Sequence, residues 1–175
     1  CDNDSTSTRN YYLVLHRGSV DINKSIYFSL SAYERIKTSS VNVSISGTAS
    51  NKGNSSISMS GVNSSVISVN LTNDTKIPNK AIVTRISSSG TQSPSQGNVH
   101  HMIMPASNGN WYTSTVSSAS SGHYNIDIDD GIPVKQKWSF KYNALATAKS
   151  TMRNVKLTIE FQYDLHDTDY ETYIR

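Results

Sequence analysis

The sequence has one cysteine, four prolines and no long hydrophobic run. Because the cysteine is Cys1 and no second thiol is present, an intramolecular disulfide and a cysteine-based zinc site are excluded. The apolar runs fall far short of the roughly 18 residues that a membrane helix needs. No secretory hydrophobic segment precedes the first predicted strand. The sequence therefore predicts a soluble chain without a transmembrane segment.

Charged and hydrophobic residues are also scarce, at 17% and 35% of the chain. Serine, threonine and asparagine take their place, yet the apolar residues recur in alternating runs, which is typical of folded β-structure and not of a disordered tail. The 175 residues fit one domain. We expect a polar arm or tether at residues 1–10 and a single β-sandwich domain at 11–175. The net charge of +3 neither requires nor excludes a polyanionic partner.

Alternating segments predict strands along the whole chain. They lie at residues 11–16, 20–30, 41–46, 57–60, 66–71, 81–86, 99–104, 111–116, 124–128, 134–142 and 155–165. Turn-forming stretches such as NKGNSS and SSSGTQSPSQGN separate them. The most helix-like segment, residues 144–153, has threonine and serine among its alanines and is predicted to be a turn or loop. Short strands at this spacing indicate an all-β, antiparallel sandwich or barrel.

Two segments show which residues should enter the core. Val41, Val43 and Ile45 share one face of a strand because strand side chains alternate. The run from Val155 to Phe161 repeats this pattern with apolar residues at every second position. We expect both faces to pack against an opposing sheet.

Basic residues supply the first candidate site. In VKQKWSFK the alternation places Lys135, Lys137 and Lys141 on one face of a strand. Such a stripe can contact phosphates, and binding would then depend on salt and little on base sequence. The alternative is a solvent-facing strand. The basic residues that we single out as candidates for nucleic-acid contact are Arg9, Arg17, Lys135, Lys137, Lys141 and Arg153.

Acidic residues supply a second candidate. Asp127, Asp129 and Asp130 precede a glycine in NIDIDDG, and calcium prefers carboxylate oxygens. The segment lacks the loop length and final glutamate of an EF-hand, so a solvated strand end or subunit contact is the alternative. His100 and His101 are adjacent, point to opposite faces of a strand and cannot readily chelate one metal together. No cofactor is expected beyond this possible calcium.

Catalytic motifs are missing, since there is no GxSxG elbow and no spacing that joins a serine to a histidine and a carboxylate. We therefore expect a protein that is not an enzyme. A sugar-binding module using Trp111, Tyr112, Tyr124 and Trp138 is a weaker alternative, because aromatic residues in strands more often belong to the core.

One stretch carries a family resemblance. The segment IYFSLSAYERIKTSSVNVSIS resembles the place in single-jelly-roll capsid (coat) proteins of small icosahedral viruses where a tyrosine-containing turn leads into a core strand. The matching residues are Phe28, Tyr33, Arg35, Ile36, Val41, Val43 and Ile45. KQKWSFKYNA and RNVKLTIEFQYDL resemble the last two capsid strands.

The resemblance implies an eight-stranded jelly roll, repeated in many copies around an icosahedral virion that encloses a nucleic-acid genome. Mechanism would then be self-assembly, with inward phosphate contacts from basic residues, calcium possible at subunit contacts, and outer loops contacting a host surface receptor. A competing interpretation starts from Cys1 and the polar DNDSTSTRN, which resemble the start of a bacterial lipoprotein. That interpretation predicts a lipid-anchored β-sandwich on the bacterial cell surface, such as an adhesin or pilus component.

Overall fold

The computed structural model describes residues 35–115, 123–128 and 131–165, with single positions among the first 30 residues. The fold below belongs to the unit that begins at Ile36. The predicted strand at 11–16 lies outside the described residues, and so does most of the one at 20–30. Phe28 and Tyr33 of the capsid-like motif also lie outside them.

The described residues form strands and no helix. The strands are β1 (Ile36–Ile45), β2 (Ala49–Asn51), β3 (Val62–Asn63), β4 (Ile67–Asn70), β5 (Ile82–Ser93), β6 (Val99–Pro105), β7 (Tyr112–Thr113), β8 (Tyr124–Ile126), β9 (Lys137–Ala144) and β10 (Ser150–Asp164). The pairings among these strands are antiparallel. The structure therefore confirms the prediction of an all-β antiparallel sandwich.

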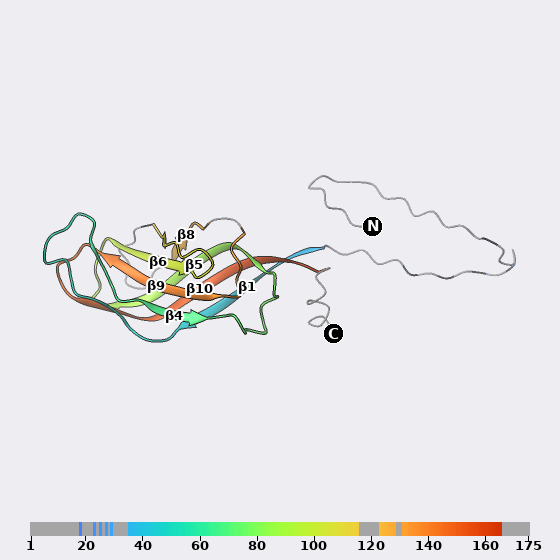
Figure 1. The fold of residues 1–175 in the computed structure, drawn as a ribbon, viewed down its shortest axis with the longest axis horizontal. Helices are drawn as coiled ribbons and strands as arrows, with labels where there is room; N and C mark the ends of the chain where they lie inside the picture. The colour runs from blue at the N-terminus through green and yellow to red at the C-terminus, as the bar shows by residue number, and fades with distance from the viewer. Residues whose placement is uncertain are drawn as a thin grey trace. The chain divides into compact units, whose positions relative to one another are not determined.

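Two sheets make up the sandwich. The first sheet has the order β1-β10-β5-β8, and β2 continues β1 along the same edge of β10. The second sheet has the order β3-β9-β6-β7, and β4 pairs with β9 beside β3. Figure 1 shows β1 and β10 running side by side, as the ten paired positions from Ile36–Asp164 to Ile45–Val155 require.

The strand pairing is nested. If β1 with β2 and β3 with β4 each count as one strand, the first strand pairs with the last, the second with β9, β5 with β8, and β6 with β7. Only β6 and β7 are consecutive neighbours within one sheet. This order is that of one long hairpin folded over into two layers.

The core lies between the sheets and follows the predicted alternation. Val155, Leu157, Ile159 and Phe161 are buried, while the intervening Lys156 and Glu160 are exposed. Val43 and Ile45 enter the same core, and Val41 packs at its edge. Side chains from β9 supply the largest buried volumes, among them Trp138, Phe140 and Tyr142. Burial of this apolar surface is the main force that holds the two layers together.

Four local predictions need correction. Residues 57–60 lie in a loop with turns and not in a strand. Oδ1 of Asn54 accepts a hydrogen bond from the backbone amide of Ser58, which closes the chain into a tight loop. Residues 87–93 were predicted as a turn but continue β5, since their serines alternate between the core and the outer face. Two short strands, β2 and β3, were not predicted. Ala144 ends β9 and Ser150–Arg153 begin β10, so only residues 145–149 of the predicted turn or loop at 144–153 lie outside strands.

Candidate polyanion-binding face

Positive charge is concentrated in the sandwich. Residues 35–165 contain twelve Lys and Arg against six Asp and Glu, whereas the rest of the chain contains four against seven. The weak net charge of the whole chain hides this separation. A local excess of positive charge attracts polyanions at long range.

The outer face of the first sheet carries part of this charge among small polar side chains. On β10, Arg153, Lys156 and Glu160 are exposed, and an irregularity in the register between Arg153 and Lys156 leaves both of these residues on the solvent side. Arg85 of β5 lies opposite Glu160 in the register, and its Nη2 donates to Oδ1 of Asn125 over 3.5 Å. Serines and threonines fill most of the remaining outward positions, so this face offers many hydroxyls and few carboxylates.

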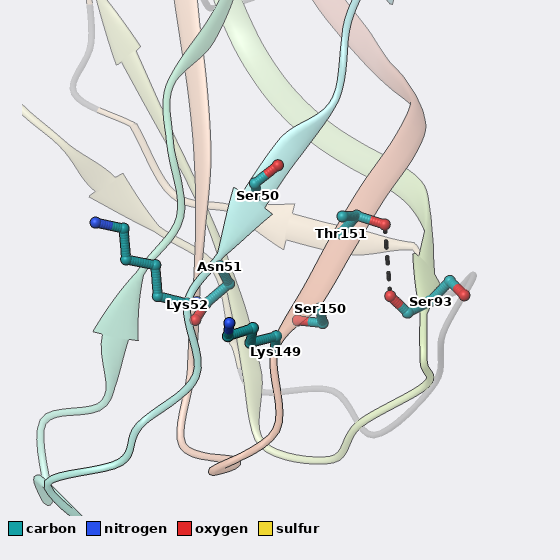
Figure 2. A pocket seen from close by; sticks show the side chains of 7 residues that line it. All are labelled: Ser50, Asn51, Lys52, Ser93, Lys149, Ser150 and Thr151. Carbon is teal, nitrogen blue, oxygen red and sulfur yellow. Dashed lines mark hydrogen bonds between the residues drawn. The ribbon is translucent and has the colours of Figure 1, made fainter.

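One end of this face is hollowed into a pocket of about 440 Å³. Its lining residues come from β2, β5 and β10 and from the loops beside them: Ser50, Asn51, Lys52, Ser93, Lys149, Ser150 and Thr151. Figure 2 shows the ammonium group of Lys149 directed toward Asn51 and the start of Lys52, whereas the Lys52 side chain extends away from Lys149; Ser50, Thr151 and Ser93 lie along the opposite side. The register places Ser50 and Ser93 on either side of Thr151, so their outward hydroxyls form one row across three strands.

Buried polar contacts hold the floor of the pocket. Oγ of the buried Ser150 accepts a hydrogen bond from Nε2 of Gln92 over 3.2 Å and lies 2.9 Å from the Tyr142 hydroxyl. Nε2 of Gln96 donates to the carbonyl of Ala148 over 2.9 Å, which ties the β5–β6 loop to the β9–β10 loop. A buried polar network that is paired in this way fixes the geometry around it.

The predicted lysine stripe is split in the structure. Lys137 is exposed on β9. Nζ of Lys135 donates to Oδ1 of Asn79 over 2.6 Å. Nζ of Lys141 sits 4.1 Å from the centroid of the Trp111 ring, a cation–π contact. Two of the three lysines therefore already have partners on the surface of the protein.

Arg153 lies two residues beyond Thr151, a lining residue of the pocket, on the same outer face. Arg9 and Arg17 lie outside the described residues, as does Cys1. Asp127 is exposed just after β8, while Asp129 and Asp130 lie outside the described part of the chain. Calcium binding there stays a prediction.

The histidines and aromatics follow the core geometry. His101 is buried and His100 is half-buried on the other face, so the two adjacent rings point in opposite directions as predicted. Tyr124 and Trp138 are buried. Nε1 of Trp138 donates to the Val134 carbonyl over 3.0 Å. Two of the four rings of the alternative sugar-binding site therefore belong to the core, while Trp111 and Tyr112 are half-buried.

Sequence reasoning missed Lys52 and Lys149. Each stands alone among turn residues, and only the fold brings the two loops together. Within the described residues, no group of three or more histidine, cysteine and carboxylate side chains is placed to hold a metal ion. No helix in the described part of the chain is long and apolar enough to cross a membrane.

Comparison with known proteins yields one close relative of undescribed function. No family model matches the chain. Over 159 residues, or 91% of this chain, the sequence is 49% identical to the uncharacterized protein YbdN of Bacillus subtilis (strain 168). The chain spans 55% of the length of that relative. A crystal structure of FLHE covers 73% of this chain and 98% of its own, with 11% identity and a TM-score of 0.39. We draw nothing from that distant likeness.

Proposed function

We propose that the chain is a structural, non-enzymatic protein that assembles from many copies into a closed shell around a nucleic acid, as a viral capsid protein does, and that its sandwich is of the jelly-roll type. The nested strand pairing is the observation that carries this proposal. Eight strands in two sheets with such connections are typical of jelly rolls, which occur in viral capsids and also in lectins and cupins. The fold alone does not choose among these functions, so surface features must support the choice.

The charge distribution supports a polyanion as the enclosed partner. Residues 35–165 carry twice as many basic as acidic residues. Several of the basic side chains lie on the outer face of the first sheet or in the pocket at its end. We propose that this face is turned toward the nucleic acid, because phosphate contacts need cations with few competing carboxylates.

An exposed apolar turn supports contact between copies. Met59 is 97% exposed and Ile57 is 78% exposed in the loop between β2 and β3. Ile57 also has a φ of +52°, a conformation that costs a β-branched residue roughly 1–2 kcal/mol. Met59 and Leu145 border a groove of about 380 Å³ on the second sheet, which His100, Met102 and Asn143 also line. We propose that neighbouring copies bury this turn.

The test is particle formation by the purified 175-residue protein with and without single-stranded RNA, followed by light scattering and negative-stain microscopy. Closed shells of uniform diameter are expected. Met59→Glu should block shell formation because it places a charge in the contact between copies, whereas Ser56→Glu in the same loop should not. A monodisperse monomer under every assembly condition overturns the proposal.

A second proposal rests on the bacterial source of the 49% identical relative. In this alternative the protein is a lipid-anchored β-sandwich on the bacterial cell surface, with lipid on Cys1. Stable anchoring requires more than one acyl chain. Mass spectrometry of the native N-terminus decides it: a diacyl or triacyl mass on Cys1 supports the surface protein, and an unmodified or internal cysteine rules it out.

A further inference from the structure

Two loops from distant parts of the chain, each with one lysine, are held together at one end of the sandwich. The amide of Asn54 donates to the Ala146 carbonyl over 2.9 Å, and its Nδ2 donates to the Leu145 carbonyl over 3.1 Å. Gly53 packs so closely that a Cβ there would lie 2.2 Å from the Thr147 carbonyl oxygen. These backbone contacts fix the two loops that carry Lys52 and Lys149.

The pocket between these loops presents hydrogen-bond donors in excess. Within the described part of the chain, neither ammonium group makes a hydrogen bond or an ion pair, and no carboxylate lines the pocket. The hydroxyls of Ser50 and Ser93 likewise make no hydrogen bond to other described residues. Each ammonium offers three donors and each hydroxyl one. A tetrahedral oxyanion supplies hydrogen-bond acceptors and the opposite charge.

The loops around the pocket are held in place, so an anion can bind without a rearrangement of the backbone. The loops are braced by Asn54 and Gln96, and the strands beneath are fixed by their register. An anion would therefore find both loops already in place, and only the flexible lysine side chains would need to be ordered. Preorganisation of this kind lowers the entropic cost of binding.

We infer that the Lys52–Lys149 pocket binds one phosphate group of a nucleic-acid backbone. This inference rests on the proposed function, which supplies the polyanion. Arg153, two residues along β10 from Thr151, is placed to take the next phosphate of the same strand. The pocket then fixes where a strand enters the basic face of the first sheet.

The experiment compares two double variants that remove the same charge. Lys52→Gln/Lys149→Gln alters the pocket, and Lys76→Gln/Lys80→Gln alters two exposed lysines outside it. Binding of a fluorescein-labelled oligodeoxythymidine is measured by anisotropy at several salt concentrations. We expect the pocket variant to weaken binding about tenfold more than the control. Its slope of log affinity against log salt should fall by about 0.7, the loss of one single-strand phosphate contact.

Two further arms make the outcomes decisive. Lys52→Arg/Lys149→Arg keeps the charge and should restore most of the binding, which shows that folding is not the cause. Heparin replaces the oligonucleotide in a parallel titration. Equal losses in the two glutamine variants, no binding by the unaltered protein, or a selective loss for heparin alone each overturn the inference.

Microscopy of the same samples separates this inference from the proposed function. Selective loss of oligonucleotide binding in a protein that never forms shells sustains the phosphate site and overturns the shell. Shells that form normally while binding is equally weakened in both glutamine variants overturn the phosphate site alone.

Discussion

His101 of β6 and Tyr124 of β8 stack face to face across the core, with ring centroids 3.6 Å apart and planes 10° apart. The two residues come from opposite sheets, so the stack joins the two layers. Nδ1 of His101 lies 2.8 Å from Oγ of Ser88 on β5. The ring of Phe140 is perpendicular to that of His101, with the two ring centroids 5.1 Å apart. Nε2 is buried and has no hydrogen-bond partner in the described part of the chain.

This environment makes folding sensitive to acid. Burial lowers the pKa of His101 from 6.5 to about 3, because the charged imidazolium would lose its water without gaining a carboxylate. The pKa of His101 in the folded state lies below its unfolded value, so above pH 6.5 the imidazole is neutral in both states and the folded protein has its full stability. This stability is lost as the pH falls from 6.5 toward 3, because the unfolded state binds a proton on His101 and the folded state does not. We expect the free energy of unfolding to drop by about 2 kcal/mol between neutral pH and pH 5.

Urea denaturation at several pH values measures this loss. His101→Phe is the matched control, since phenylalanine can keep the stack on Tyr124 but does not titrate. The variant should lose the part of the pH dependence between pH 6.5 and 5 that belongs to His101. An identical pH dependence in the two proteins would show that His101 does not titrate in this way.

Gly53 and Gly131 provide a test of the contact that brings the pocket loops together. Both have a φ of +81°, but a Cβ at Gly131 meets nothing within 4 Å, whereas one at Gly53 overlaps the Thr147 carbonyl. Gly131→Ala should cost roughly 1–2 kcal/mol of unfolding free energy, the backbone cost alone. Gly53→Ala should cost about 2 kcal/mol more, because the loops must separate. Chemical denaturation of both variants measures the difference, and equal costs would contradict the close packing.

Much of the sandwich could be predicted from alternation, because burial of one strand face leaves a period of two in the sequence. Val43, Ile45 and Leu157 all take the predicted side. The pattern failed where the buried residues are small or polar. Ser88 is buried against His101, and Gly90 packs against Met152, so their stretch was predicted as a turn.

The pocket could not be predicted in the same way. A single lysine in a turn carries no periodic signal, and the partners of Lys52 and Lys149 are set by tertiary contacts. The lysine stripe on β9 was visible because its residues are neighbours in sequence. Sequence alone did not show that Asn79 and Trp111 already contact two of its members.

The Lys141–Trp111 contact should be measurable as a coupling energy. A cation over an aromatic ring at an exposed site contributes about 0.5–1 kcal/mol. Partial burial lowers the pKa of Lys141, in keeping with its position against the ring. A double-mutant cycle with Lys141→Met and Trp111→Leu should give a coupling in that range, whereas Lys137→Met with Trp111→Leu should be additive. Additivity in both cycles would show that the contact contributes nothing.

Ile57 should show opposite effects on stability and assembly. Within the described residues, the other non-glycine residues with positive φ are Asn98 and Asn154, and asparagine tolerates this conformation because its short polar side chain bonds locally. Isoleucine is β-branched, 78% exposed and unfavourable there, so the native residue gives up stability at this position. Strain of this kind is found where a surface has a function.

Replacing Ile57 by asparagine relieves the strain and removes the apolar side chain that we propose lies between copies. We expect Ile57→Asn to raise the free energy of unfolding by about 1 kcal/mol and to reduce the yield of shells. Urea denaturation of the unassembled protein and light scattering of the assembly reaction measure the two effects, with Ser56→Asn as the neighbouring control. A less stable variant would contradict the strain argument, and an unchanged shell yield would remove Ile57 from the contact between copies. The two measurements together separate a residue kept for assembly from one kept for the fold.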